Sequence, residues 1–266
     1  MSAAPALRVT VLTAFPHWLG PVFAEGVLGR AGRAGQIAID VRDLRAHAHD
    51  RHHSLDDEPF GLGAGMLMKA EPVLEAMDAA AAPGRAVRVL LAPDGEPFGQ
   101  AAAADLAQAR HLILVCGRYE GVDDRVREHV DRVLSLGDFI LMGGEAAAWA
   151  VVEAVVRLVP GVVEARSLAE ESFGDGLLEA PQYTRPHRLR WRGGEQAVPD
   201  VVRAGDHGRE RLARRRAALC RTLIRRPDLL RGYAALSGDS ALWGDVLVAA
   251  ATWGGRAVDW SDRMLY

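Results

Sequence analysis

Three short glycine-containing segments stand out as places where backbone groups could hold a small molecule. Each follows an apolar, β-rich run of residues, and they read LLAPDG (90–95), CGRYEG (116–121) and SLGDFILMGGE (135–145). In an open α/β sheet, ligands bind beyond the carboxyl ends of the strands, and glycines there let backbone groups approach a ligand closely. None of the three matches the dinucleotide fingerprint or the triphosphate loop. The pattern favours a small-molecule site of another kind.

A histidine-rich stretch offers a second kind of chemistry. Between residues 47 and 57 it gathers imidazole and carboxylate groups, at His47, His49, Asp50, His52, His53, Asp56 and Asp57. Ligand-rich stretches of this kind can bind zinc. The stretch lacks the HExxH pattern, however, and polar loops on RNA-contacting surfaces have a similar composition. We therefore expect no metal site here.

Arginine is concentrated in the C-terminal part of the chain. Residues 185–231 contain 14 Arg against five acidic residues, a balance of +9, which leaves −12 for the rest of a chain whose formal net charge is −3. A basic block on an otherwise acidic protein is what binding to phosphate groups requires. Lys69 is the only lysine, so arginine replaces lysine throughout. That preference explains the residue type but not the clustering, and an anionic partner is favoured.

The composition and the N-terminal residues limit the class of protein to which the chain can belong. The 266 residues are 49% hydrophobic and 25% charged, which is ordinary for a soluble globular protein. No apolar run approaches the roughly 20 residues that cross a bilayer, and the start of the chain lacks the pattern of a secretory signal. Cys116 and Cys220 are too few for a disulfide framework or a zinc site. We expect a cytoplasmic protein with two buried thiols and no membrane contact.

Short strands alternate with helices along the first 160 residues, which predicts a mainly parallel α/β sheet with flanking helices. The strands are expected at 7–14, 37–44, 88–93, 111–117 and from 133 onward, and the helices at 20–31, 71–81, 99–109 and 145–157. The polar, glycine-rich stretch from about 46 to 66 is expected to form no regular element.

The alternation of strands and helices is absent between about 161 and 184. An Arg-rich helix is expected at 208–226, and Pro227 ends it. We therefore divide the chain into a domain of residues 1–163, a linker or lid of residues 164–183, and a helical, basic domain of residues 184–266.

A series of longer motifs, taken in order, resembles one known family. The motifs are DRHHSLDDEPFGLGAGMLM (50–68), LILVCGRYEGVDDRV (112–126), SLGDFILMGGE (135–145), RLVPGVV (157–163), EESFGDGLLEAPQYTRP (170–186) and RAGDH (203–207). Together they are similar to the bacterial tRNA (guanine-N1)-methyltransferases that modify the guanosine immediately 3′ of the anticodon. The resemblance covers about residues 7–231, and the last 35 residues carry no motif of the family.

The resemblance implies a knotted (trefoil) α/β domain of the SPOUT superfamily, an exception to the rule that folds avoid threading, with a smaller all-α C-terminal domain. It implies a homodimer with each active site at the subunit interface, S-adenosylmethionine as methyl donor, tRNA as substrate, and Mg²⁺ as a candidate further requirement.

The resemblance also assigns residues to binding. Backbone and side chains of the three glycine loops are expected to hold the donor, at Leu91, Ala92, Pro93, Gly117, Arg118, Tyr119, Glu120, Ser135, Leu136, Gly137, Phe139, Leu141, Gly143 and Gly144. We expect Gly117, Gly143 and Gly144 to accept no side chain, because the donor would lie against bare backbone. The residues expected to contact tRNA are Asp56, Gly65, His207, Arg214 and Arg221.

Two residues match the catalytic positions of the family. Arg157 in RLVPG would stabilise negative charge on guanine O6, and Glu171 would remove the N1 proton. Glu170 is the competing candidate for the base. Many members have Asp where this chain has Glu171, and a reach that differs by ~1 Å can cost on the order of 10²-fold in rate. A second departure is Leu62, which interrupts a run of three glycines usual in the family.

Two other functions stay open. A knotted methyltransferase acting on another RNA atom, such as a ribose 2′-hydroxyl, would need no carboxylate at Glu171. An RNA-binding protein that kept the fold and lost the chemistry is supported equally well by the arginine block.

Overall fold

The computed structural model describes residues 4–61, 65–81 and 84–231. The chain forms two compact units, Met1–Ala165 and Arg166–Tyr266, which we call unit 1 and unit 2. The departure at Leu62 and the last 35 residues lie outside the described residues. The proposed division at 163 and 184 stays a prediction.

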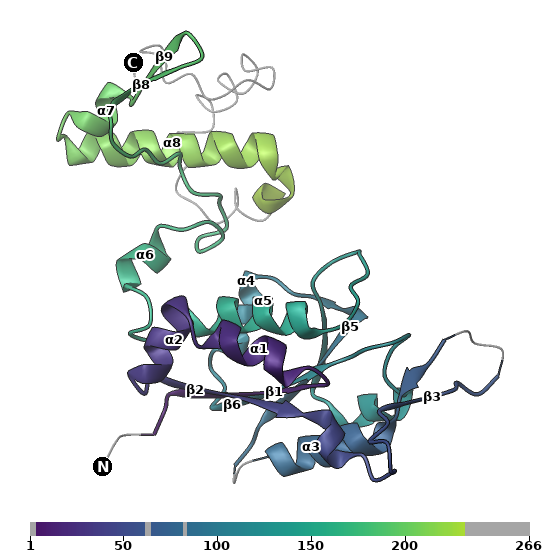
Figure 1. Ribbon diagram of the computed structural model, residues 1–266. Coiled ribbons are helices and arrows are strands. Elements are labelled where there is room, and N and C mark those ends of the chain that lie inside the picture. Colours follow the sequence, from purple (N-terminus) through teal and green to yellow (C-terminus); the bar gives the residue numbers. More distant parts are fainter. Residues whose placement is uncertain (1–3, 62–64, 82–83, 232–266) are drawn as a thin grey trace. The chain divides into compact units, whose positions relative to one another are not determined.

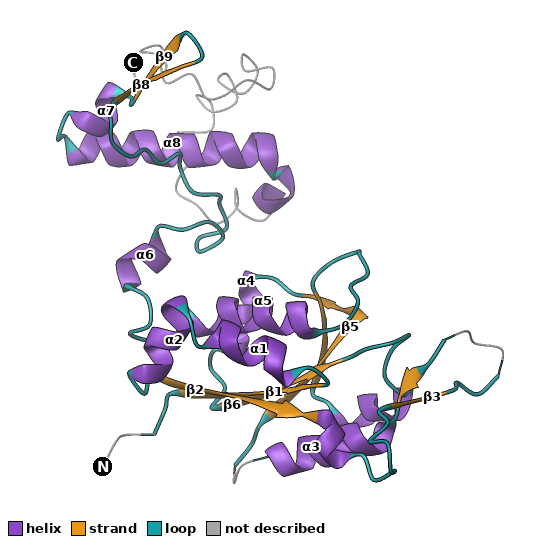
Figure 2. Ribbon diagram, in the orientation of Figure 1, coloured by secondary structure: helices purple, strands orange, loops and turns teal. Residues whose placement is uncertain are grey.

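Unit 1 is built on a five-stranded sheet with the order β2-β1-β6-β5-β7, in which every pairing is parallel (Figure 2). This confirms the mainly parallel α/β sheet. All six residues of the central strand β6, sequence HLILVC, are buried, as expected for a strand covered on both faces. The strands are β1 (Leu7–Thr13), β2 (Ile37–Asp43), β5 (Val87–Pro97), β6 (His111–Cys116) and β7 (Arg132–Ser135).

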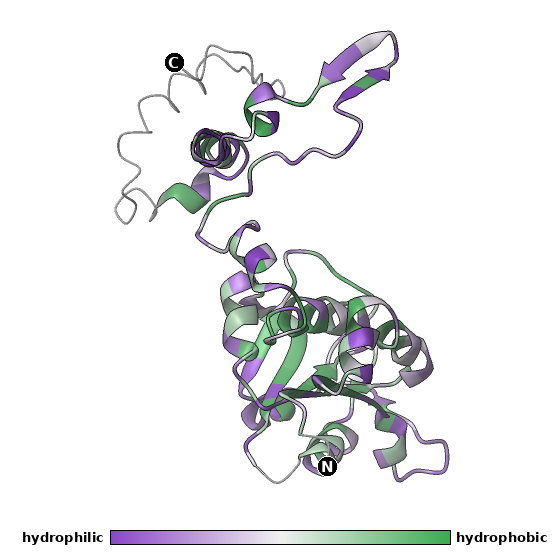
Figure 3. Ribbon diagram, turned by 90° about the vertical axis from the view of Figure 1, so that its left-hand side faces the viewer, coloured by the Kyte–Doolittle hydropathy of each residue, from purple (hydrophilic) through white to green (hydrophobic). Residues whose placement is uncertain are grey.

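Helices cover both faces of this sheet (Figure 1). One face packs against α1 (Pro16–Phe23), α2 (Gly26–Arg33), α4 (Gln100–Leu106) and α5 (Glu145–Val156). The other face packs against α3 (Ala70–Ala80) and the 3₁₀ turns η1 (Leu44–His47) and η2 (Asp124–His129). Neighbouring strand residues alternate between the two cores, and the apolar strands appear green in Figure 3.

The prediction of one helix over 20–31 is wrong. Two helices, α1 and α2, occupy this region because Glu25 is extended and Gly26 has a φ of +58°, a conformation that favours glycine. Pro16 begins α1 earlier than expected, since proline suits the first turn of a helix.

The expectation of no regular element between 46 and 66 is also wrong in part. Asp56–Asp57 (β3) pairs in antiparallel fashion with Leu67–Met68 (β4). Two-residue strands have no alternation to detect. This pair is held by long-range backbone bonds, from Met68 N to Gly121 O at 2.9 Å and from Asp123 N to Met68 O at 2.9 Å.

Unit 2 is not all-α, so that prediction is wrong. Arg188–Trp191 (β8) and Gly194–Ala197 (β9) form an antiparallel hairpin. Its two-residue loop has positive φ at both Arg192 (50°) and Gly193 (80°), as the preferred hairpin turn requires. The helical elements are α6 (Ala165–Ala169), α7 (Asp200–Arg203), α8 (His207–Arg225) and η3 (Pro227–Arg231).

The long helix α8 agrees closely with the expected Arg-rich helix. Its N-cap residue, Asp206, accepts hydrogen bonds from Gly208 N and Arg209 N, which satisfies two free amide groups. The preceding segment 170–179 packs along α8, where Leu178 N donates to Thr222 Oγ1 at 2.9 Å. The middle of the expected linker is therefore fixed to α8.

Candidate active site

The three glycine loops of unit 1 enclose one cavity of about 530 Å³ at the carboxyl ends of the neighbouring strands β6, β5 and β7. Ligand pockets usually measure about 300–1,000 Å³. Every residue that the sequence assigned to the donor lines this cavity. Leu90, Asp94, Gly121 and Ile140, which belong to the three predicted loops, also line the cavity. The lining residues outside these loops, which sequence reasoning missed, are Leu67, Val122, Arg127, Leu134 and Ala147.

The loops after β6 and β7 lie directly against each other. Gly144 N donates to Gly117 O at 2.8 Å, and a side chain on Gly144 would place its Cβ 2.8 Å from Cys116 Cα. At Gly143 an added Cβ would lie 2.6 Å from Glu145 Oε2. Glycine is therefore required at Gly144 by backbone contact between the loops, whereas a side chain at Gly143 would displace the side chains of Arg118 and Glu145. At Gly117 the nearest atom, Val122 Cγ2, would be 3.3 Å away, so this glycine is less constrained.

A buried ion pair joins these loops to the end of β1. The carboxylate of Glu145, the first residue of α5, is almost fully buried. Its Oε1 accepts hydrogen bonds from Thr13 Oγ1 (2.8 Å) and Arg118 Nε (3.1 Å), and its Oε2 lies 2.9 Å from Arg118 Nη2. Sequence reasoning missed Glu145, because an acid in the first turn of a helix is ordinary and its partners are distant in the chain.

Two residues expected to contact tRNA lie in or near the β3–β4 pair, against the loop after β6. Glu120 N donates to Met66 O at 3.0 Å, and a Cβ on Gly65 would lie within 3 Å of the Glu120 side chain. Burial raises the pKa of the Tyr119 phenol, and its hydrogen bond to Asp56 raises that pKa further. Asp56 and Gly65 therefore both lie next to residues that line the cavity.

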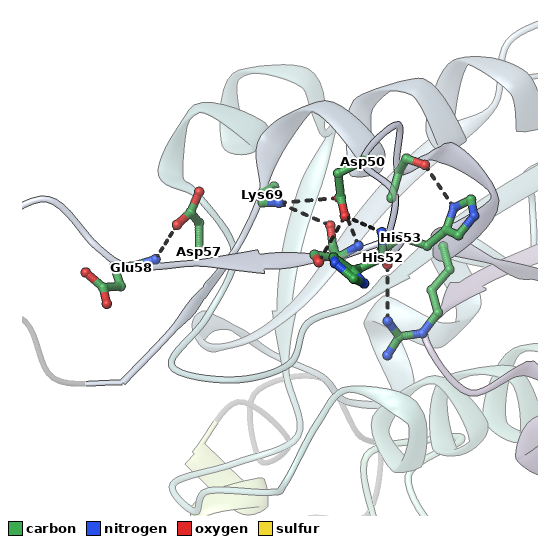
Figure 4. Close-up of polar contacts among 9 residues, drawn as sticks. Asp50, His52, His53, Asp57, Glu58 and Lys69 are labelled. Atoms are coloured by element: carbon green, nitrogen blue, oxygen red, sulfur yellow. Dashed lines mark hydrogen bonds and ion pairs between the residues drawn. The ribbon is translucent and has the colours of Figure 1, made fainter.

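The histidine-rich stretch is organised by its own polar contacts (Figure 4). Asp50 accepts hydrogen bonds from His52 N and Ser54 N, both at 2.9 Å, and forms an ion pair with Lys69 at 3.7 Å. Lys69 also donates to Ser54 O at 3.3 Å. His53 Nδ1 lies 3.0 Å from Ala48 O. These contacts fix the loop that leads into β3.

His49 takes part in a separate contact, since its Nε2 lies 2.8 Å from Glu75 Oε2. That hydrogen bond, together with the charge of Glu75, raises the pKa of His49 and favours the protonated imidazole, which binds no metal. Within residues 4–61, 65–81 and 84–231, no three His, Cys, Asp or Glu side chains gather in a way that could hold a metal ion. Nothing there supports Mg²⁺.

The sequence matches the profile described as tRNA (Guanine-1)-methyltransferase TrmD over residues 7–232. The chain belongs to this family. A protein of Chloroflexus aggregans named tRNA (guanine-N(1)-)-methyltransferase is 52% identical, over 86% of this chain and 89% of its own length. Relatives of the same name from Chloroflexus aurantiacus (50% identical, 86% and 90% covered) and Salinispora arenicola (46%, 88% and 92%) also match.

The two residues predicted to act in catalysis belong to different units. Arg157 directly follows α5 in unit 1 and is half-buried, and Glu171 follows α6 in unit 2 and is also half-buried. Their joint action stays a prediction. The competing carboxylate, Glu170, forms ion pairs with Arg166 at 3.2 Å and with Arg214 at 3.5 Å.

The expected tRNA-contacting residues of unit 2 all lie on α8. His207 is exposed at its first position. Arg214 forms its ion pair with Glu170, and Arg221 Nη1 donates to Glu179 O at 3.0 Å. Both arginines therefore also tie α8 to the segment before it.

The two cysteines agree with the sequence analysis. Cys116 and Cys220 are both buried as free thiols, as predicted, and burial raises the pKa of each. No helix in the part of the chain that the structure describes is long and apolar enough to cross a membrane.

Proposed function

We propose that the chain transfers a methyl group from S-adenosylmethionine to N1 of the guanosine 3′ of the anticodon in tRNA. The observation that carries the proposal is the cavity enclosed by three loops on neighbouring parallel strands, in a chain of the TrmD family. The names of the relatives specify the same base and atom.

The cavity suits a donor made of a nucleoside joined to an amino acid. Its lining combines apolar side chains, such as Leu91 and Leu136, with the backbone of glycine loops. Charged groups of both signs also line it, including Arg118, Glu120 and the Asp94–Arg127 ion pair at 2.9 Å. The bound donor would supply a methyl group activated by its positive sulfonium.

The family's trefoil knot is part of the proposal. The close contact of the loop ending at Gly144 with the loop beginning at Gly117 supports it, since a threaded chain has to bring these segments into direct contact.

Guanine N1–H is a poor acid, so N1 becomes nucleophilic only as its proton leaves. We assign removal of that proton to the carboxylate of Glu171 and stabilisation of the charge on O6 to the guanidinium of Arg157. Glu170, whose carboxylate forms ion pairs with Arg166 and Arg214, is the competing candidate for the base.

An apolar surface around Arg118 supports the proposed homodimer. The guanidinium lies 4.3 Å from the ring centroid of Phe15 and donates to Met142 O. Phe15 and Met142, which both contact Arg118, are exposed, Met142 at 89%. Trp18 on α1 and Trp149 on α5 are also exposed, and these two helices contact each other. Grouped apolar residues at a surface mark interaction sites, and a second copy of the chain is the proposed occupant.

We propose that unit 2 binds tRNA phosphates through α8, with the exposed Arg209 and Arg211 acting alongside His207, Arg214 and Arg221. Phosphate contacts position a nucleic acid, and base contacts specify it. The Arg209→Gln/Arg211→Gln variant should weaken tRNA binding about equally for all accepted tRNAs. It should flatten the dependence of log affinity on log salt by up to ~1 per lost contact, with donor affinity unchanged.

The matched variant Arg214→Gln/Arg221→Gln should flatten the salt dependence too, and should also lower the melting temperature, because it removes contacts to Glu170 and Glu179 O. If the variant has a lower melting temperature but the salt dependence of the wild type, Arg214 and Arg221 hold α8 against the preceding segment and do not contact tRNA phosphates.

Nucleoside mass spectrometry of tRNA after incubation with the protein and S-adenosylmethionine tests the proposed function. We expect 1-methylguanosine at the position 3′ of the anticodon. A 2′-O-methylated nucleoside would indicate another RNA target, and tRNA binding without any methylation would indicate an RNA-binding protein.

A further inference from the structure

We infer that Glu145 is a positioning residue for the methyl donor: it holds Arg118, and through Arg118 the loop from Phe139 to Gly144, in the arrangement that encloses the cavity. The inference rests on the proposed function, because it takes the cavity as the donor site. Glu145 does not line the cavity, whereas Arg118 and most of this loop do.

The burial of Glu145 demands a partner. The residue is 1% exposed, and an isolated carboxylate is costly to remove from water. Arg118 supplies the compensating charge, with Nε at 3.1 Å from Oε1 and Nη2 at 2.9 Å from Oε2. Thr13 Oγ1 adds a hydrogen bond to Oε1 at 2.8 Å. The carboxylate therefore fixes the Arg118 side chain in one orientation.

Arg118 in that orientation reaches the loop after β7. Its third nitrogen, Nη1, donates to Met142 O at 3.1 Å, and its backbone forms a bridge with Gly143. A Cβ added at Gly143 by substitution would lie 2.6 Å from Glu145 Oε2 and would therefore collide with this ion pair. The loop is therefore packed tightly against the ion pair, and the guanidinium links the Glu145 carboxylate to the loop.

A purely structural ion pair would explain the burial equally well, so stability alone cannot separate the two roles. Removing one partner of a buried pair destabilises a protein in either case. Only the positioning role predicts that donor binding weakens in a protein that remains folded, while tRNA binding and the turnover of the saturated enzyme persist.

The test compares three variants of the full chain, each measured well below its melting temperature. Glu145→Gln keeps the shape and removes the charge, and Glu145→Asp keeps the charge and shortens the reach. Asp78→Asn is the matched control, because it breaks an exposed 2.8 Å ion pair with Arg88 remote from the cavity. The dissociation constants of S-adenosylmethionine and tRNA are measured by calorimetry, and kcat at saturating donor.

For Glu145→Gln we expect the donor dissociation constant to rise at least ~10-fold, with kcat at saturation within ~3-fold of wild type and tRNA affinity unchanged. Glu145→Asp should lie between this variant and wild type, and Asp78→Asn should match wild type. A wild-type donor dissociation constant in folded Glu145→Asp or Glu145→Gln would overturn the inference. If the wild-type protein itself bound no donor, the proposed function would fall instead.

Discussion

Arg157→Ala and Glu171→Gln should each lower turnover by at least ~10²-fold and leave donor affinity nearly unchanged. The arginine variant removes the cation that we propose lies next to O6, and the glutamine variant removes the proposed base for the N1 proton. Neither residue lines the donor cavity, so the loss should appear in kcat at saturating donor. Single-turnover methylation of tRNA measures it.

Glu170→Gln is the matched control for this pair. It changes the neighbouring carboxylate, which forms ion pairs with Arg166 and Arg214. This variant should reduce turnover only slightly. If Glu170→Gln is inactive while Glu171→Gln turns over normally, the base is Glu170.

Mixing the two inactive proteins tests the dimer. If Arg157 and Glu171 of one active site come from different subunits, a mixed dimer contains one intact site. Random exchange of subunits should then restore about a quarter of wild-type activity. A mixture that stays inactive although native mass spectrometry shows mixed dimers would place both residues on one chain.

Gly144→Ala should abolish donor binding in a protein that still folds. The new Cβ would lie 2.8 Å from Cys116 Cα and 3.0 Å from Gly117 N, so the two loops must separate and the cavity must change shape. Calorimetry with S-adenosylmethionine should show at least a ~10²-fold weaker complex, since a shift of about 1 Å in a positioned site can cost that much.

Gly99→Ala is the control, because a Cβ there would meet no atom within 4 Å and Gly99 does not line the cavity. Gly117→Ala should weaken donor binding by less than Gly144→Ala, since its closest contacts would be 3.3 and 3.4 Å. Unchanged donor affinity in Gly144→Ala would contradict the assignment of these loops to the donor.

The sequence predicted the sheet and the cavity because both depend on local patterns. Buried parallel strands such as β6 read as continuous apolar runs, and the glycines that follow them mark the edge where ligands bind. The long helix α8 was equally predictable, from its Arg-rich helical pattern and the proline after its end.

The features that the sequence missed depend on long-range contacts or on very short elements. β3 and β4 are two residues each and are held by Gly121 and Asp123, far along the chain. The hairpin β8–β9 is exposed on both faces, so its strands lack the alternation that reveals a half-buried strand. The ion pair of Glu145 joins residues 27 positions apart, and its hydrogen bond to Thr13 spans 132.

The loop from Phe139 to Gly144 has one consequence for how assembly and ligand binding depend on each other. Phe139, Leu141 and Gly143 line the cavity, while Met142 is exposed within the apolar surface around Arg118. A donor that restricts the motion of this short loop leaves less conformational entropy to be lost when a second subunit binds to it. By linkage, a second subunit that binds first lowers the entropy lost on donor binding in the same way. If the protein binds the donor and dimerises as proposed, the donor should tighten the dimer by the same factor by which dimerisation tightens donor binding, and dilution should weaken both together.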